Sequence, residues 1–365
     1  MKLKKLLCIL LCAVICVTTL VSCGEGGIGS WSGAYGEPEP PREEIALNMY
    51  IIVGEGTTKN AITTVQNMIN QYTKSNFSTI LTVHYLTEAE YEDKVMADIA
   101  ADKTNTPIGG AVPEVDILLV TSADMMDQLM DGQYLLDLTS YFNTDTYGKL
   151  NTNIAESLLL ASKIDGKFYC VPNNHVVGSY EYLVINKAKA EELNYGPKTI
   201  TTYDTMEKCQ ELCDAIAANG DTVEDFVYEI KNGKYEDKAA IEASGEWVCN
   251  IVKKPVVTAE EAFASAFAVS STIDEKNAER CFEILYALNM DVYFRNLLQY
   301  GVNVTNYTID ENEVVTRKIN DENNAYNMNI LYTGNLFKAY FCEELGWTKT
   351  AKTNGEAQNN DSTAN

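Results

Sequence analysis

Few side chains in this sequence have the types and spacing that enzyme chemistry requires. The two histidines, His84 and His175, lie too far apart along the chain to form an HExxH zinc helix. The sequence holds no CxxC pair and no G-x-S-x-G nucleophile elbow. Paired acids such as Glu260 and Glu261 stand in loop-like contexts, whereas glycoside hydrolysis needs two carboxyls that face each other across a cleft. The sequence therefore predicts no catalytic residue, no metal site and no cofactor.

Several polar side chains instead suit a neutral, hydroxylated solute. Glu55 lies in a Gly-Glu-Gly turn, where its carboxylate could accept hydrogen bonds from hydroxyl groups. A phosphate loop is disfavoured there, because Lys59 stands where a dinucleotide fingerprint needs its third glycine. Thr121 and Ser122 follow a buried strand, where they either cap the next helix or line a cleft. Glu55, Thr121 and Ser122 are candidate solute contacts, with a solvated turn and a helix cap as the alternatives.

A second group of candidates lies further along the chain. Asn173 and Asn174 offer amide donors and acceptors to a polyhydroxyl ligand. The adjacent His175 is either a further contact or an ordinary hydrogen-bonded histidine. Tyr180 and Trp247 have flat apolar faces that suit sugar rings, and packing in a core is the alternative for both.

The elements that must position these groups alternate between strand and helix. Apolar and β-branched residues predict strands over 45–53, 79–85 and 115–120, and apolar residues at spacings of three and four predict a helix after each. Such alternation implies right-handed crossovers and a mostly parallel sheet. Open sheets of this kind bind ligands beyond the carboxyl ends of their strands, where Glu55 and Thr121 lie.

The second half of the sequence repeats the alternation less regularly. The predicted elements are extended segments over 168–172 and 180–186, a helix over 203–218, a strand over 263–269, one long helix over 275–300, a hairpin over 307–316 and a last helical stretch over 329–345. The polar residues 348–365 are expected to form a disordered tail. Two α/β units joined by extended strands leave a cleft between them, which is a common place for a small-molecule site.

The N-terminal residues 1–22 have the parts of an export signal. Lysines precede an apolar stretch that is too short to span a bilayer comfortably. The tetrapeptide Leu-Val-Ser-Cys that ends at Cys23 resembles a bacterial lipobox, so Cys23 is the expected site of acylation. Residues 23–43 are rich in Gly and Pro and suit a flexible tether. A plain signal peptide and an uncleaved anchor are the alternatives.

Charge and cysteine content limit the partners. With 28 basic and 52 acidic residues, the chain carries a net charge of −24, which disfavours a nucleic-acid partner. The cysteines after the export signal follow no disulfide pattern, and scattered buried thiols or one incidental disulfide are expected. Cys209 and Cys213 would share one helical face, yet no further ligand is spaced for a metal.

Four segments resemble the extracellular solute-binding lipoproteins of bacterial ABC importers, of the carbohydrate type. They are the lipobox followed by the strand and helix of residues 45–72, the run 166–172 leading into 182–187, the run 266–271 with the helix after it, and the stretch from Tyr300 through the 307–315 hairpin to Gly334-Asn335. The second run is similar to a G-x-x-Y-x-[VI]-P strand that passes through the hinge of the family into an L-x-Y-N-K strand. Together these segments cover most of residues 43–347.

The resemblance implies an α/β, two-lobe periplasmic-binding-protein-like fold with hinge strands and an inter-lobe cleft. The expected first lobe comprises residues 44–177 with 270–300, and the second lobe residues 178–269. Residues 301–347 are expected to pack across the lobes. Only 84 residues, 179–262, separate the two hinge strands, so the second lobe is shorter than is usual in the family.

The resemblance also implies a function. The expected protein is a monomeric receptor and no enzyme, anchored by its lipid on the outer face of the cell membrane. Its lobes close on a small solute, a mono- or oligosaccharide, which it delivers to the permease subunits of an ABC importer. The alternatives are a receptor for a peptide or a polyol, a carbohydrate-active hydrolase, and a degenerate lobe pair that serves as a surface sensing module.

Overall fold

The computed structural model of the protein describes residues 42–365, and residues 43–365 form one compact unit. The expected export signal, Cys23 and the tether up to residue 41 lie outside the described residues. Within residues 42–365, no helix is both long and apolar enough to cross a membrane.

The larger core of the unit is built on a five-stranded sheet with the strand order β2-β1-β3-β11-β6. The strands are β1 (Ile45–Ile52), β2 (Thr79–Leu86), β3 (Ile117–Val120), β6 (Cys170–Pro172) and β11 (Ala266–Val269). β1 is parallel to both β2 and β3, whereas β11 is antiparallel to both β3 and β6. The three strands predicted in the first part of the sequence are therefore confirmed, and β11 brings a later return of the chain into the same sheet.

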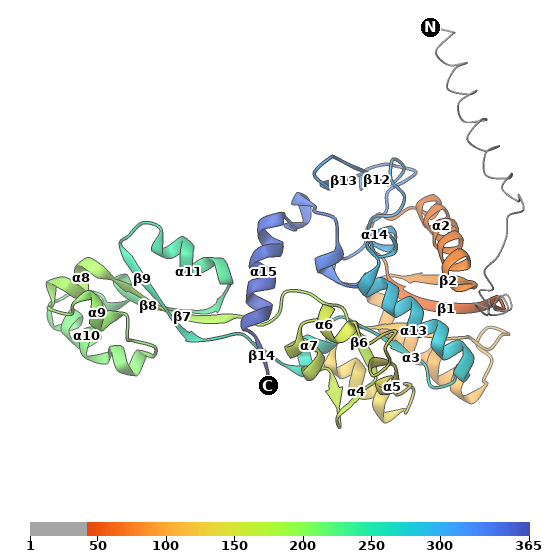
Figure 1. The fold of residues 1–365 in the computed structure, drawn as a ribbon, viewed down its shortest axis with the longest axis horizontal. Coiled ribbons are helices and arrows are strands. Elements are labelled where there is room, and N and C mark those ends of the chain that lie inside the picture. The colour runs from red at the N-terminus through yellow and green to blue at the C-terminus, as the bar shows by residue number, and fades with distance from the viewer. Residues whose placement is uncertain (1–41) are drawn as a thin grey trace, which may run out of the picture. The chain divides into compact units, whose positions relative to one another are not determined.

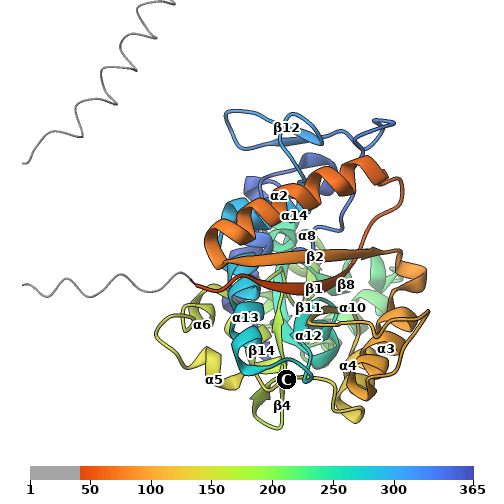
Figure 2. The same cartoon turned by 90° about the vertical axis from the view of Figure 1, so that its right-hand side faces the viewer.

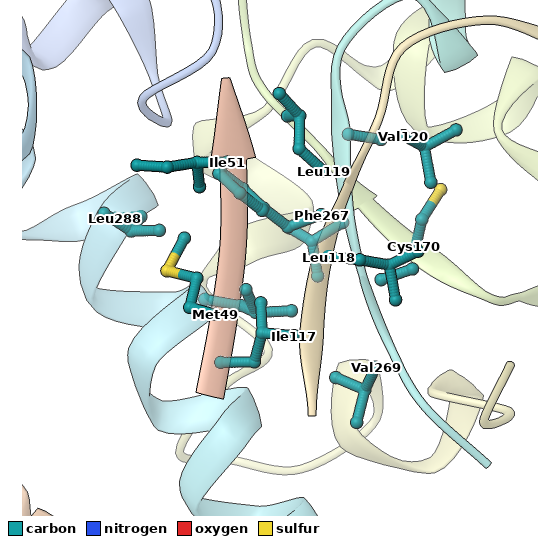
Figure 3. Close-up of a cluster of buried hydrophobic side chains, with 14 of the residues drawn as sticks. Met49, Ile51, Ile117, Leu118, Leu119, Val120, Cys170, Phe267, Val269 and Leu288 are labelled. Carbon is teal, nitrogen blue, oxygen red and sulfur yellow. The ribbon is translucent and has the colours of Figure 1, made fainter. Parts of the chain in front are cut away.

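Helices between and after these strands cover the sheet (Figures 1 and 2). They are α2 (Lys59–Phe77), α3 (Glu88–Thr104), α4 (Ala123–Asp131), α12 (Ala259–Phe263), α13 (Glu275–Met290) and α14 (Val292–Tyr300). α2 begins after the N-cap Thr58, whose side chain accepts a hydrogen bond from the Ala61 N–H, and it packs against β2 and α14. α13 contacts β1, and its Leu288 lies beside Met49 and Ile51 in the buried cluster of Figure 3.

The smaller core is built on the antiparallel sheet β8-β7-β9, with β7 (Tyr180–Asn186), β8 (Val227–Gly233) and β9 (Trp247–Lys253). Leu183 and Ile185 of β7 are buried with α8 (Lys187–Glu192), α9 (Pro197–Ile200) and α10 (Met206–Ala218). Tyr182 and Val184, at the alternate positions of β7, belong to a separate buried cluster that includes Ile241 of α11 (Tyr235–Glu242). The structure thus has two α/β cores, which we call the first lobe (larger) and the second lobe (smaller).

The remaining elements are short, apart from the last helix. They are α5 (Thr139–Phe142), α6 (Leu150–Asn153), α7 (Glu156–Ala161), β4 (Lys163–Ile164), β5 (Lys167–Phe168), η1 (Val223–Asp225), β10 (Val256–Val257), β12 (Tyr307–Ile309), β13 (Val315–Arg317), η2 (Leu336–Lys338), η3 (Glu343–Leu345), α15 (Lys349–Asp361) and β14 (Thr363–Ala364). β14 pairs in parallel with β10, so the last residues of the chain are held beside the segment that returns from the second lobe.

The prediction of a disordered tail over residues 348–365 is wrong. Thr348 caps α15 by accepting from the Ala351 N–H, and the helix buries Gly355 and Gln358 rather than an apolar stripe. A polar composition therefore concealed an ordered helix, because its buried contacts are made by a glycine and an amide. The helical stretch predicted over 329–345 is also wrong, since these residues form only the short turns η2 and η3.

Other boundaries differ for local reasons. The helix predicted over 275–300 is interrupted at Asp291, whose side chain accepts from the Phe294 N–H and starts α14. The strand predicted over 263–269 begins only at Ala266, because α12 occupies the residues before it. In the second lobe, β8, α11 and β9 were not predicted.

The lobe boundaries also differ from the expected ones. Residues 255–269, expected in the second lobe, contribute Val257, Phe263 and β11 to the first core. Residues 301–347, expected across the lobes, pack on the first lobe through bonds such as that from the Gly54 N–H to the Asn327 carbonyl, at 2.8 Å. The element that joins the second lobe is α15, which packs beside α11 (Figure 1).

Candidate functional site

One edge of the first-lobe sheet brings together three of the predicted solute contacts. β1 and β3 are parallel, so the turn that holds Glu55 and the Thr121-Ser122 pair follow strands that end at the same edge. Glu55 is exposed, and Thr121 and Ser122 are half-buried. Ser122 caps α4 by accepting from the Met125 N–H at 3.0 Å, so it serves as a helix cap and still borders the edge.

Asn173 follows β6 at this edge but lies in the interior. Its side-chain amide donates to the Ser265 hydroxyl at 2.9 Å and to the Leu331 carbonyl at 3.1 Å. Its side-chain oxygen is buried and has no hydrogen-bond partner within residues 42–365. The segment around Leu331 covers Asn173, so this amide is a structural group in the observed conformation.

Asn174 borders a polar cavity of about 550 Å³ between α6, α7 and α15. The cavity is rich in asparagines, and the amides of Asn174 and Asn335 are hydrogen-bonded to the backbone. Asn174 accepts from the Ala155 N–H and donates to the Asn153 carbonyl, and Asn335 also donates to that carbonyl. Five other side chains that line the cavity, those of Glu156, Lys338, Lys352, Glu356 and Asn360, form no hydrogen bond or ion pair within the described residues.

His175, directly after Asn174, is also buried. Its Nδ1 lies 2.7 Å from the Asn173 carbonyl oxygen, and burial lowers the pKa of the imidazole. A neutral, hydrogen-bonded imidazole in this place fits the structural alternative that the sequence left open.

The chain crosses between the lobes twice, and the two crossings touch. The first crossing is residues 173–179 and the second is residues 254–258. Gly178 of the first has a φ of +64°, and a Cβ on it would lie 2.6 Å from the Cβ of Pro255 in the second. The Gly178 N–H donates to the Glu261 carboxylate at 2.6 Å. Only glycine fits this contact, because any Cβ at residue 178 would force the two crossings apart.

A cavity of about 400 Å³, which we call the hinge pocket, lies between segments of both lobes. Its walls are Val176, Gly178 and Ser179 of the first crossing, residues 232–234 at the end of β8, Glu236 of α11, and residues Leu336, Trp347 and part of α15. Within the described residues, the side chains of Ser179, Asn232 and Glu236 form no hydrogen bond or ion pair. The hinge pocket therefore offers a solute unused donors and acceptors, and unlike the asparagine-rich cavity it takes its walls from both lobes.

Trp347 gives the hinge pocket an aromatic wall. The side chain is buried, and its ring meets Phe337 edge-on with the centroids 5.6 Å apart. The indole N–H is buried and has no acceptor within residues 42–365. Sequence reasoning missed this tryptophan, although Thr348 directly after it is a helix N-cap signal that would have placed it at an ordered helix start.

Tyr180 and Trp247, the predicted aromatic contacts, lie within the second lobe. Tyr180 is buried and stacks on Tyr182, with the ring centroids 5.3 Å apart. Trp247 is half-buried and meets Tyr228 edge-on at 5.6 Å. Both belong to the cluster beneath α11, which matches the core alternative, and the structure does not bring them to the other candidates.

Burial raises the pKa of all six described cysteine thiols. The six described cysteines are all buried and unpaired, and burial raises the pKa of the Cys170 thiol to about 12. Cys209 and Cys213 have their Sγ atoms 4.0 Å apart without a disulfide. Residues 42–365 contain no group of three or more His, Cys, Asp or Glu side chains that could hold a metal.

A family model for bacterial extracellular solute-binding proteins matches residues 67–273, which is more than half of the chain. The chain belongs to this family. Among curated proteins, no sequence matches this solute-binding protein.

Solved structures agree on the fold. An N-glycan transport solute-binding protein from Streptococcus pneumoniae is 15% identical, with a TM-score of 0.56, and the match covers 88% of this chain and 84% of that chain. The same Streptococcus protein in complex with Man5GlcNAc gives a TM-score of 0.54 at 15% identity, over 88% of this chain and 83% of that chain. The α/β two-lobe fold of the solute-binding family is thereby confirmed for this chain.

Proposed function

We propose that this solute-binding protein is the extracellular receptor of an ABC importer and that it carries a mono- or oligosaccharide bound between its lobes. The observation that carries the proposal is the hinge pocket, because its walls come from both lobes and from the crossing that joins them. Its volume of about 400 Å³ lies in the ordinary range for small-molecule sites. A solute in this position makes contacts that depend on the angle between the lobes, as closure requires.

The chemistry of the pocket favours a neutral sugar. Trp347 offers an aromatic wall, and Ser179 and Asn232 offer uncharged donors and acceptors. The buried indole N–H of Trp347 has no acceptor within the described residues, and an unsatisfied buried donor costs roughly 1–3 kcal/mol. The net charge of −24 disfavours an anionic solute. The Streptococcus relative that matches this fold has been solved with Man5GlcNAc, which supports the same class.

The edge of the first-lobe sheet is the second part of the proposed site. Glu55, Thr121 and Ser122 share that edge with turns open to solvent, and they remain our candidates for contacts made by the first lobe. Asn173, Asn174, His175, Tyr180 and Trp247 are engaged in the interior, and we propose only supporting roles for them.

The cellular setting follows from the sequence. We propose that residues 1–22 direct export, that Cys23 carries the lipid, and that residues 23–43 tether a monomer to the outer face of the membrane. The loaded receptor then docks on the permease subunits. No catalytic step is part of this proposal, and the family and the matched structures are binding proteins.

Isothermal titration calorimetry of the purified protein against a panel of neutral mono- and oligosaccharides tests the proposal. We expect at least one sugar to bind, and we expect Trp347→Phe to weaken that sugar about ten-fold or more through loss of the indole. Trp247→Phe, the matched control at a tryptophan within the second lobe, should leave the affinity unchanged.

Other outcomes contradict separate parts of the proposal. Binding of a peptide or polyol panel but of no sugar would show the carbohydrate class to be wrong and leave the receptor in place. Sustained turnover of a chromogenic glycoside by the purified protein would show that an enzyme had been overlooked. A protein that binds no member of any panel and does not close on scattering analysis would contradict the receptor itself.

A further inference from the structure

Gln358 of α15 holds three walls of the hinge pocket together through one amide group. Its oxygen accepts from the Tyr235 N–H at 3.1 Å, and its nitrogen donates to the carbonyls of Gly178 at 2.7 Å and of Val177 at 3.1 Å. The side chain is only 4% exposed, so it exchanges these partners for water poorly. We infer that Gln358 is a positioning residue that sets the place of the second lobe against the hinge and so fixes the shape of the solute site.

Each partner of Gln358 belongs to a different part of the site. Tyr235 is the first residue of α11 in the second lobe and stands next to Glu236 of the pocket wall. Gly178 precedes Ser179 on the first crossing, and Gln358 itself lies on the helix that starts just after Trp347. The amide of Gln358 therefore links the wall that carries Ser179, the wall that carries Glu236 and the helix that follows Trp347. α15 also contacts the second lobe through the hydrogen bond from the Tyr180 hydroxyl to the Asp361 carboxylate.

The neighbouring Asn359 provides a natural contrast. It accepts from the Val177 N–H at 3.0 Å and donates to the His175 carbonyl at 2.7 Å, so it binds the same first crossing. Both of its partners lie on that crossing and neither lies in the second lobe. Gln358 and Asn359 both bind the first crossing. Of these two residues, only Gln358 also forms a hydrogen bond with α11.

The hydrogen bond to the second lobe can be deleted without touching α15. Tyr235 occupies the first position of α11, where proline is well tolerated, and Lys234 before it has the extended backbone that precedes proline readily. Tyr235→Pro removes the N–H that Gln358 accepts. Tyr235→Ala removes the same ring but keeps the N–H, so the pair isolates the hydrogen bond.

The direct readout is the distribution of distances between the lobes, measured on the full protein without any solute. Nitroxide labels attached through Asp93→p-acetylphenylalanine on α3 and Glu211→p-acetylphenylalanine on α10 report it, and both positions are exposed. We expect Tyr235→Pro to broaden or shift the distribution and Tyr235→Ala to leave it as in the wild type. Identical distributions for the two variants would overturn the inference.

Variants on α15 test the same point from the other side. Gln358→Met keeps the length of the side chain and loses all three bonds, whereas Asn359→Ala loses two bonds, both to the first crossing. We expect both to lower the melting temperature but only Gln358→Met to change the distance distribution. If Gln358 only stabilises the fold, both variants should lower the melting temperature and neither should change the distance distribution. That outcome would contradict the inference that Gln358 positions the second lobe.

The effect on solute binding rests on the proposed function. If a sugar is identified by calorimetry, Tyr235→Pro should weaken it about five-fold relative to Tyr235→Ala, which is the loss expected for one hydrogen bond. Equal affinities would contradict a role in shaping the site. The distance measurement uses no sugar. A wild-type protein that binds no sugar would therefore contradict the proposed function, and the positioning role of Gln358 would still be tested by the distance distributions.

Discussion

The Tyr180 hydroxyl donates a hydrogen bond to the Asp361 carboxylate at 2.7 Å, and Lys254 approaches the same carboxylate at 2.9 Å. Tyr180 begins β7 after the first crossing, and Lys254 opens the second. One residue near the end of α15 thus binds both segments of chain that join the lobes. A helix formed by polar residues late in the sequence is a structural part of the hinge.

Asp361→Asn should lower the free energy of unfolding by about 1 kcal/mol at pH 7, because it weakens two charge-assisted hydrogen bonds. Hydrogen bonds from Lys254 and Tyr180 lower the pKa of the Asp361 carboxyl from its ordinary value of 3.8. Its stabilising contribution is therefore present above pH 3.8 and is lost as the pH falls through the lower pKa of the folded state.

Urea denaturation of wild type and Asp361→Asn at pH 7 and at pH 3 measures this contribution. The difference in unfolding free energy between the two proteins should shrink at the lower pH. Asp93→Asn, at an exposed position of α3, is the control and should change little at either pH. A difference that persists unchanged at pH 3 would show that the carboxylate charge is unimportant.

Gly178→Ala should destabilise the protein by more than Gly166→Ala does. Both glycines have positive φ, +64° and +79°, so an alanine strains the backbone at either position. A Cβ at residue 166 meets nothing within 4 Å, whereas a Cβ at residue 178 would lie 2.6 Å from the Pro255 side chain. We expect about 1 kcal/mol for Gly166→Ala and an additional 1–3 kcal/mol, roughly, for Gly178→Ala because of overpacking between the crossings.

Thermal and urea unfolding of the two glycine variants provide the comparison. Equal losses would mean that the crossings separate at no cost and that their contact does not restrain the hinge. A larger loss at residue 178, together with an altered distance between the lobes, would show that the contact limits hinge movement.

We expect Asp116 to make the first lobe more stable in mild acid than at neutral pH. Burial raises the pKa of its carboxyl to about 6, and hydrogen bonds from Asn48 offset part of that increase. Since the folded protein holds this proton more tightly than the unfolded chain, the contribution is fully present below pH 3.8 and is lost as the pH rises through about 6.

Asp116→Asn should remove this pH dependence. The unfolding free energy of the variant minus that of the wild type should therefore be larger at pH 7.5 than at pH 5. The amide oxygen can still accept from the Asn48 N–H, which now approaches the carboxylate at 2.6 Å. Asp93→Asn, at an exposed position of α3, is again the control. If the stability difference between Asp116→Asn and wild type is the same at both values of pH, the carboxyl titrates normally.

The sequence predicts an element well when the residues of that element determine it, and poorly when a single hydrogen bond or a distant segment does. β1, β2 and β3 were predicted because their apolar residues bury each strand by themselves, and the shared edge of Glu55 and Thr121 followed from parallel pairing alone. The break at Asp291 was missed since the apolar spacing continues across it while one side-chain hydrogen bond starts a new helix. β8 was missed because only its first and last residues, Val227 and Gly233, are buried and charged residues stand between them.

The hinge pocket could not be predicted, because its walls are set by contacts between residues far apart in the sequence. Gln358 lies 180 positions from Gly178, and nothing in the composition of residues 348–365 indicates such a partner. Trp347 is a related case, since its ring forms a wall of the hinge pocket only because it packs against Phe337 and stands next to α15. Periodicity reports which face of an element is buried, but it does not report which distant segment an amide will bind.

Gly355→Ala separates the local preference of α15 from its packing. Alanine is favoured over glycine inside a helix by roughly 1 kcal/mol, so local preference alone predicts that the variant is more stable. The added Cβ would, however, lie 2.4 Å from the Val176 side chain and 3.4 Å from the Phe337 ring. Because Val176 belongs to the first crossing, relief of this overlap must move α15 away from the hinge, and we expect a net loss of about 1–3 kcal/mol.

Urea denaturation and the distance between the lobes together decide the case. Thr353→Ala, at an exposed position of the same helix, is the matched control and should change the unfolding free energy little. If Gly355→Ala unfolds at higher urea than the wild type, α15 does not pack tightly on the first crossing, and its role in the hinge is wrong. If the variant is less stable and its lobes are less fixed, then close approach of the helix to Val176 is what requires a glycine in an otherwise polar helix.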